Sequence, residues 1–292
     1  MREFSKLQVF EGWFCNMGDW NMRVRYVSGR VGGVSVSDTG TTLHCYSARS
    51  LNDTGLRDAI HLKGCTVEDC FDLESIFSSK CDQLKKLSLT LRNLPDLIVL
   101  VGVGESSLST FSSLKEITLC SSHNIKKLFE ADRALHNLEK IEVNHCLQLE
   151  EIITEPEGEG MGANNDSIKF NFPKLTTLIL ANLPKLKGIC SENAVMVCKS
   201  LQVIEISNCP KVKRIPLYLP QLEVDDEGQL SPFNTLQEIR VRTTDWWESV
   251  EWEHPNLNVK NVVQPLLKFC NRYNLEWRPA VGLSSIFAAM EK

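Results

Sequence analysis

Apolar residues recur along this chain with one fixed spacing. If the first apolar residue of each copy is position 0, apolar side chains return at positions 3, 5, 11 and 14, and position 8 holds Cys, Leu, Ser or Thr. Copies in this frame begin at Leu62, Leu114, Leu138, Leu175, Leu201 and Leu236. We interpret a further copy, from Leu84, as irregular, with two extra residues that delay its second half to Leu94.

The spacing predicts one short strand in every copy. Residues two apart, such as Ile204 and Ile206, lie on one face of a strand, and the residue between them lies on the other. A single strand cannot bury this face, but stacked copies build a continuous core and a parallel sheet. After the strand, the compact side chain at position 8 is expected to turn inward, where Cys70, Cys146 and Cys209 stand.

This string is the leucine-rich-repeat signature. It predicts an α/β solenoid, a horseshoe with a parallel β-sheet on its concave face, irregular strand-and-loop coils and few helices. We expect divergent repeats or a truncated cap in residues 1–55, repeats in 56–254, and a partly helical cap or tail in 255–292.

Two insertions and the C-terminal end depart from the repeat. Residues 155–169 and 218–232 are rich in acidic residues and are expected to form loops. The pattern stops at Val250, and the nearby tryptophans, Trp246, Trp247 and Trp252, would cover the last coil. Apolar residues at helical spacing follow, and Pro265 limits the expected helix to the part after it, unless Pro265 sits in its first turn.

Composition narrows the function. The chain has 32 basic and 37 acidic residues and a net charge of −5, which disfavours general binding to nucleic acid. It has no secretory signal and no apolar run long enough to span a membrane, so we expect a soluble cytoplasmic protein, with the nucleus as a second location. Its 11 cysteines include no Cys-x-x-Cys pair, which favours structural thiols over zinc or disulfides.

No motif in the sequence indicates catalysis. There is no Walker lysine, no pair of histidines at helical metal-binding spacing and no nucleophile elbow. The glycines at 158, 160 and 162 lie among glutamates, which would repel a phosphate. We therefore expect no enzyme, no cofactor and no metal, and we look for function on the surface.

Positions 2, 4 and 6 of each copy should line the concave face. Ile179 and Val203 place apolar side chains near its centre among polar neighbours, which suits a protein interface, although scattered surface aliphatic residues are also normal. The candidate protein-binding residues are Thr118, Lys140, Glu142, Ile179, Val203, Glu205, Arg240 and Arg242.

Basic residues also recur at positions 12 and 13. They are Lys126, Lys127, Lys187, Lys213 and Arg214, and they are interrupted by Glu150 and Glu151. They form either a solvated face or a docking strip for an acidic partner domain.

Two segments and the tryptophan-rich end carry a resemblance. Residues 138–153, LEKIEVNHCLQLEEII, residues 201–215, LQVIEISNCPKVKRI, and residues 246–255, WWESVEWEHP, resemble plant coiled-coil nucleotide-binding leucine-rich-repeat disease-resistance proteins. The resemblance covers roughly residues 56 to 270. It implies a repeat region that senses pathogen effectors or modified host proteins and restrains an ATP/ADP-switched domain.

The coiled coil and the nucleotide-binding domain have no counterpart in this sequence, so nucleotide binding is not carried over. The expected partner is a protein: an effector, a guarded host protein or the nucleotide-binding domain of the same receptor. The alternative is a substrate-recognition repeat domain of a ubiquitin-ligase adaptor, which would have an F-box-like helical segment upstream.

Overall fold

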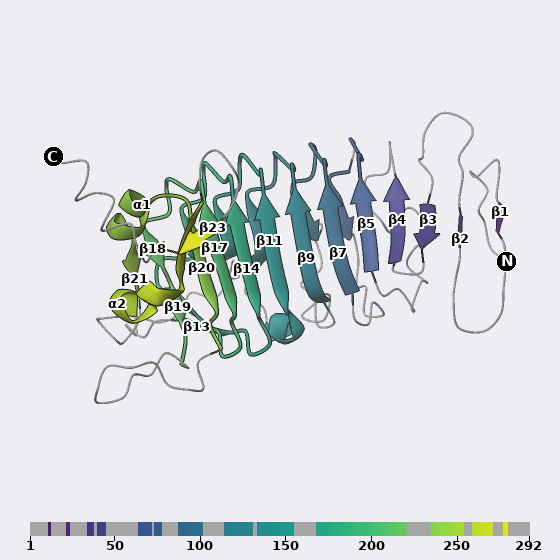
Figure 1. Ribbon diagram of the computed structural model, residues 1–292. Helices are drawn as coiled ribbons and strands as arrows, with labels where there is room; N and C mark the ends of the chain where they lie inside the picture. Colours follow the sequence, from purple (N-terminus) through teal and green to yellow (C-terminus); the bar gives the residue numbers. More distant parts are fainter. Residues whose placement is uncertain are drawn as a thin grey trace.

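A computed structural model gives the fold of the chain. It describes residues 11–12, 22–23, 34–37, 40–44, 64–71, 73–77, 87–101, 114–130, 133–154, 168–220, 235–253, 259–270 and 277–279. Within these residues, short strands stack coil upon coil (Figure 1). This confirms the predicted α/β solenoid with few helices.

One long sheet runs through the stack. Its nine central strands pair in parallel, and one antiparallel strand flanks them at each end, β3 beside β4 and β23 beside β22. In spatial order the strands are β3 (Val34–Ser37), β4 (Gly40–His44), β5 (Gly64–Glu68), β7 (Leu87–Arg92), β9 (Leu114–Cys120), β11 (Lys140–Asn144), β14 (Thr177–Ala181), β17 (Val203–Ser207), β20 (Glu238–Val241), β22 (Leu267–Cys270) and β23 (Trp277–Pro279).

Shorter strands form the opposite side of the coils. Three small parallel groups are β6 (Ser75–Phe77) with β8 (Val99–Val101); β10 (Lys127–Glu130), β12 (Glu151–Thr154) and β15 (Gly188–Cys190); and β18 (Arg214–Ile215) with β21 (Glu251–Trp252). A further group is β13 (Ile168–Asn171), β16 (Ala194–Val197) and β19 (Leu217–Tyr218). The remaining elements are an antiparallel pair, β1 (Glu11–Gly12) with β2 (Met22–Arg23), the helices α1 (Thr244–Ser249) and α2 (Val259–Val263), and the 3-10 turns η3 (Arg133–Asn137) and η4 (Gln264–Leu266).

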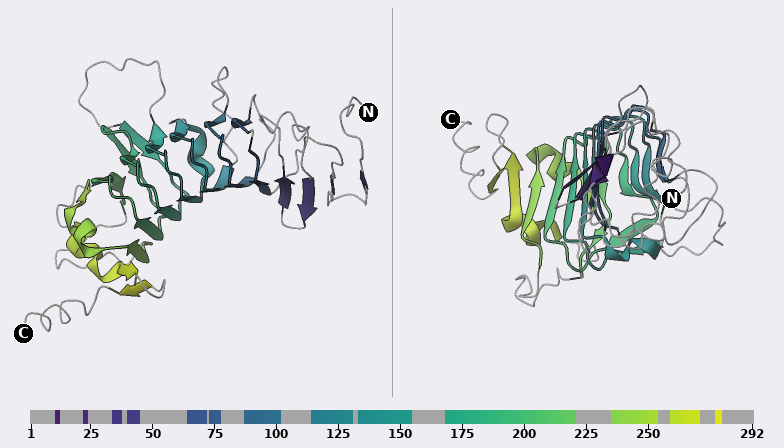
Figure 2. Two further views of the ribbon diagram at one scale, coloured as in Figure 1. Left: turned by 90° about the horizontal axis from the view of Figure 1, so that it is seen from above. Right: turned by 90° about the vertical axis from the view of Figure 1, so that its right-hand side faces the viewer.

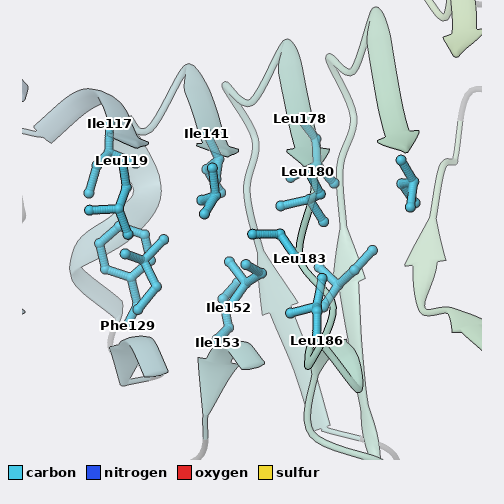
Figure 3. Close-up of a cluster of buried hydrophobic side chains, with 14 of the residues drawn as sticks. Ile117, Leu119, Phe129, Ile141, Ile152, Ile153, Leu178, Leu180, Leu183 and Leu186 are labelled. Carbon is cyan, nitrogen blue, oxygen red and sulfur yellow. The ribbon is translucent and has the colours of Figure 1, made fainter. Parts of the chain in front are cut away.

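The core lies between the long sheet and these shorter strands. Leu178 and Leu180 of the sheet point toward Leu183 and Leu186 on the return side of the same coil (Figure 3). All four side chains have no exposed surface. The predicted strand phase is therefore confirmed, because the buried residues are those at positions 3, 5, 8 and 11 of the copy.

Position 8 is buried, as predicted for the cysteines there. Cys146 is fully buried and its thiol faces the carbonyl of Asn144 at 3.5 Å, while the thiol of Cys209 faces the carbonyl of Leu180 in the preceding coil, also at 3.5 Å. Burial raises the pKa of both thiols to about 12. These thiols therefore stay protonated near neutral pH and serve as small packing groups.

Position 7 is the sharp turn that ends each sheet strand. Among the described residues, the non-glycine residues with positive φ all stand at this position: Asp69, Asn93, Ser121, His145, Asn182 and Asn208, with φ between 50° and 57°. The backbone N–H groups of the first five donate to the next coil, as Asn182 does to Ser207 at 2.9 Å. Side chains stack too, because the Asn208 amide donates to Asn182 at 2.6 Å, and the Asn182 amide donates to Asn144 at 2.9 Å.

The copy that we interpreted as irregular keeps the normal spacing. Leu89 pairs with Ile117 and Leu91 with Leu119, so these two residues hold positions 3 and 5, and Leu94 holds position 8 without any delay. The irregularity is instead a β-bulge between Leu87 and Ser88, opposite Leu114 and Glu116. The prediction of two extra residues was wrong because leucines at 84 and 87 mimic the start of a copy.

The repeat also continues beyond Val250. Leu267 and Phe269 of β22 pair in parallel with Ile239 and Val241, so this segment adds another coil. The helix expected after Pro265 is absent from the described residues there; α2 lies before the proline, and β22 follows it. Proline has no N–H to continue the helical ladder, and the extended chain after it gains a sheet partner instead.

The tryptophans pack inside the C-terminal coils. Trp247 is 4% exposed and meets Trp252 edge to face, with 5.9 Å between ring centroids. Trp246 donates its indole N–H to the Val212 carbonyl at 3.2 Å, and Trp252 donates to Leu217 at 2.8 Å. They therefore bind the coil of β20 to the coil before it, rather than covering the end of the stack.

Several expectations concern residues outside the described ranges. In the first 55 residues, only the four short strands β1 to β4 are described. Most of both predicted acidic loops also lies outside the description. At their ends, however, residues 168 and 169 belong to β13, and Tyr218 belongs to β19, so both segments include strand residues.

A pair of neighbouring substitutions tests the strand phase. Leu180→Ala should lower the free energy of unfolding by about 2–5 kcal/mol, because it removes buried apolar volume. Ile179→Ser should change it little, because Ile179 lies on the partly exposed face. Urea denaturation of both variants measures this, and a larger loss for Ile179→Ser would contradict the phase.

Substitutions at Asn182 test the position-7 turn. Asn182→Ala should cost about 1–2 kcal/mol, because alanine tolerates the left-handed conformation poorly. Asn182→Gly loses the same side-chain bonds but accepts positive φ, so it should cost less. Thermal or urea melts of the two variants provide the comparison, and equal losses would show that the side-chain ladder, rather than the backbone conformation, dominates.

Candidate functional site

The candidate site lies on the outward face of the long sheet. The stack bends so that this sheet lies on the inner side of the bend (Figure 2, left). Positions 2, 4 and 6 of each copy point away from the core, and at these positions the described side chains of β11, β14 and β17 are partly exposed, apart from the buried Ala181. The outward face of the long sheet is therefore the concave face that the sequence predicts.

Position 4 forms one continuous row across the sheet. The pairing register gives the order Thr42, Thr66, Thr90, Thr118, Glu142, Ile179, Glu205, Arg240 and Lys268. Threonines therefore occupy four neighbouring coils, and charged residues occupy most of the others. Ile179 stands between two glutamates, Glu142 and Glu205, and is the apolar member of the row.

The eight residues predicted as a binding site all lie on or beside this row. Thr118, Glu142, Ile179, Glu205 and Arg240 are consecutive members of it. Of the other three, Lys140 pairs with Thr177 in the register, Val203 lies between Thr177 and Glu238, and Arg242 follows the end of β20. The fold thus brings the predicted set together, and its role in binding remains a prediction.

Ion pairs hold the charged half of this face. Arg240 contacts Glu205 at 3.5 Å and also pairs with Glu238, which in turn accepts from Lys268. The side chains of Glu205 and Glu238 are only 14% and 12% exposed. In the coils of β17, β20 and β22, two carboxylates thus lie against two cations, which fixes these long side chains. In β11, two coils before Glu205, Lys140 pairs with Glu142 at 2.7 Å.

The two half-buried glutamates respond differently to this setting. Burial raises the pKa of Glu205, and the nearby Arg240 and Ser207 offset only part of that effect. Burial also acts to raise the pKa of Glu238, but its bond from Lys268 and the charge of Arg240 outweigh it and lower that pKa below 4.5. Glu238 is therefore the more firmly ionised carboxylate of this network.

Sequence reasoning missed some residues of this face. Lys268 was overlooked because its coil was assigned to the C-terminal tail, although the alternation of Leu267 and Phe269 marks a strand. Ser88, Thr90 and Arg92 were left out because their copy was placed in the wrong frame. The apolar pair Leu89 and Leu91, followed by Leu94, is the signal that would have corrected that frame.

The basic strip proposed from positions 12 and 13 is broken by carboxylates. Lys187 pairs with Glu150 at 2.5 Å, and Arg214 pairs with Glu253 at 2.5 Å. Elsewhere in the described parts of the chain, no three His, Cys, Asp or Glu side chains gather as a metal site would require. Nor does any described helix have the length and hydropathy needed to cross a membrane.

Comparison with known proteins gives one family match. Residues 100–221 match a family model described as plant disease resistance protein RPS2-like, leucine-rich repeats. No solved structure matches significantly.

Curated relatives come from Arabidopsis thaliana. The chain is 26% identical over 217 residues to the probable disease resistance protein At4g27220, and that match covers 62% of this chain and 23% of the relative. It is 32% identical over 146 residues to the probable disease resistance protein At4g14610, covering 50% of this chain and 19% of the relative. With disease resistance protein SUMM2 it shares 25% over 219 residues, which is 73% of this chain and 21% of the relative.

The chain thus spans less than a quarter of the length of these relatives. Its coils, its repeat signature and the matched region point in the same direction. Residues 100–221 are similar to the leucine-rich repeats of plant disease resistance proteins, which confirms the resemblance found in the sequence.

Proposed function

We propose that this chain is a non-enzymatic protein-recognition module of an intracellular plant immune receptor, acting in the cytoplasm or the nucleus. In a full-length receptor it would sense a pathogen effector or a modified host protein and restrain the nucleotide-binding switch. The relatives named as disease resistance proteins support this reading. They favour it over the ubiquitin-ligase adaptor.

One observation supports the concave face as the protein-binding surface. Ile179 lies on the concave face between Glu142 and Glu205, with Val203 in the adjacent strand. An apolar centre inside a rim of charged side chains is the usual composition of a protein interface. Binding energy concentrates in a few central residues, so Ile179 is the residue on which we expect affinity to depend most.

The ion pairs support the same surface. Arg240 is already held by Glu205 and Glu238 in the unbound chain. A partner that meets this arginine therefore immobilises a side chain that has little freedom left to lose, which reduces the entropic cost of binding. A carboxylate of the partner would compete with Glu205 for Arg240, because the contact between Arg240 and Glu205 is the longer of the two that hold this arginine.

The network has a consequence for stability against acid. Because the pKa of Glu238 is lowered in the folded chain, its contribution to stability is present above the usual value of 4.5 and is lost as the pH falls through the lowered value. The Glu238→Gln variant should therefore be less stable than the wild type near pH 7, and this difference should shrink as the pH falls below 4.5. Urea melts of both proteins from neutral to acidic pH measure it. Glu192→Gln, on an exposed turn, provides the control, and a constant difference across the range would contradict the assignment.

The recognition surface can be tested by separating it from the acidic insertion. The triple variant Ile179→Asp, Glu205→Lys, Arg240→Glu should lose its partner in pull-downs from plant extract, followed by mass spectrometry, because it changes the centre and reverses the rim. Its circular dichroism should match that of the wild type. The identified partner should then bind purified wild-type chain and not the triple variant.

The control is deletion of residues 157–165, which should leave capture unchanged, since ordering a glycine-rich segment costs conformational entropy. Capture that survives the triple substitution but disappears with the deletion would place recognition on the insertion and would refute the proposed surface.

A further inference from the structure

A second surface lies at the edge where the sheet strands end and the coils turn. We call it the turn edge and define it as the described residues at positions 9, 10 and 12 of the six coils that follow β5, β7, β9, β11, β14 and β17. Phe71 is 47% exposed, Leu147 is 45% exposed and Ile98 is 54% exposed. These are the large exposed hydrophobic residues of the described chain, and all three lie on this edge. Such clustering of exposed apolar residues marks an interaction site.

Position 9 forms a ridge along the turn edge that is apolar in five of its six coils. In coil order its residues are Phe71, Pro95, His123, Leu147, Pro184 and Pro210. Backbone hydrogen bonds on both sides keep these positions in line. Position 7 bonds from coil to coil, as from His145 to Ala181 at 3.1 Å, and position 12 does the same, as from Lys187 to Glu150 at 2.8 Å. Equivalent positions therefore stack directly over one another.

The charges beside this ridge differ at its two ends. The first two coils carry Glu74 and Asp96, both exposed. In the last two coils the same positions are basic and exposed, with Lys185, Lys187, Lys211 and Lys213. In the middle, Lys126 and Glu150 occupy position 12 of adjacent coils, and the Glu150 N–H donates to the Lys126 carbonyl at 2.8 Å. The turn edge is thus acidic at one end, basic at the other and mixed between.

The charges of one turn edge are complementary to those of a second copy that runs in the opposite direction. If two copies meet edge to edge about a two-fold axis, each position faces the same position of the other copy, while the order of coils is inverted. Glu74 then faces Lys213 of the second copy, Asp96 faces Lys185, and Lys126 faces Glu150. The ridge follows the same rule, with Phe71 opposite Pro210 and His123 opposite Leu147. A self-complementary patch of this kind is the requirement for a two-fold symmetric dimer.

We propose that the turn edge is the interface of an antiparallel homodimer of these repeats. A partner with a single sign of charge would be repelled at one end of the edge, and a second copy stacked in the same direction would place like charges opposite each other. Reversing the second copy removes both problems. The six coils extend over about 24 Å at the spacing of sheet strands, so the interface is small and we expect a dimer of micromolar affinity. The concave face stays open in this arrangement.

Sedimentation of the full chain, with concentration varied up to about 200 µM, tests the proposal at low and high salt. The wild type should dimerise, and salt should weaken the dimer because charged pairs contribute to it. The acid-end variant Glu74→Lys, Asp96→Lys should dimerise about tenfold or more weakly, because lysines then meet lysines. The basic-end variant Lys185→Glu, Lys213→Glu should be weakened similarly. An equimolar mixture of these two variants should recover a heterodimer.

A matched control separates interface charge from total charge. Glu116→Lys, Glu192→Lys changes the net charge by as much as the acid-end variant, but at exposed sites away from the turn edge, and it should dimerise like the wild type. Circular dichroism confirms that each variant is folded. A wild type that stays monomeric over the whole range overturns the proposal, as does a mixture of the two charge variants that fails to associate. Equal weakening by the control would also overturn it.

Discussion

Backbone hydrogen bonding from one coil to the next is the interaction on which this structure depends. A strand of four to seven residues has almost no partner within its own coil, so its N–H and C=O groups must be satisfied by its neighbours. The same holds at the turns, where position 7 donates to the adjacent coil, and at the start of the return strands. Each coil is therefore stable only as part of a stack, and the buried leucines and isoleucines contribute their packing energy only once that stack exists.

This dependence also shapes the two surfaces. Side chains at one position lie at strand spacing along the whole stack, so any charge has a near neighbour on either side. On the concave face, carboxylates compensate neighbouring cations, because Glu238 pairs with both Arg240 and Lys268, which are adjacent in the row. At the turn edge, acidic residues lie at one end of the stack and basic residues at the other. A molecule with the reverse order of charges is therefore complementary to this edge.

Much of the fold could be predicted because positions 3, 5, 8 and 11 obey a simple rule of burial. From the sequence alone, that rule places Leu180 and Cys146 inside and Ile179 and Glu205 outside. It failed where other leucines imitate the pattern, as at residues 84 and 87, and where proline suggested an end, as at Pro265. The ion pairs of Glu238 and the left-handed turns escaped prediction for another reason. They depend on which coils are neighbours and on backbone conformation, and neither is encoded in apolar spacing.

The turn at position 7 separates the length of a coil from the layout of its surfaces. The Asp69 N–H donates to the Arg92 carbonyl, 23 residues further along the chain, whereas the His145 N–H makes the equivalent bond to the Ala181 carbonyl, 36 residues further along. The sheet strands on either side of the longer coil, β11 and β14, still pair without a shift in register, as β5 and β7 do around the shorter one. A gene for such repeats can therefore gain or lose segments between coils while the concave face keeps its geometry. Conversely, single substitutions at positions 2, 4 and 6 can change the chemistry of the concave face without removing any side chain from the buried core. In a receptor of the kind we propose, binding specificity would therefore evolve largely separately from the packing of the core.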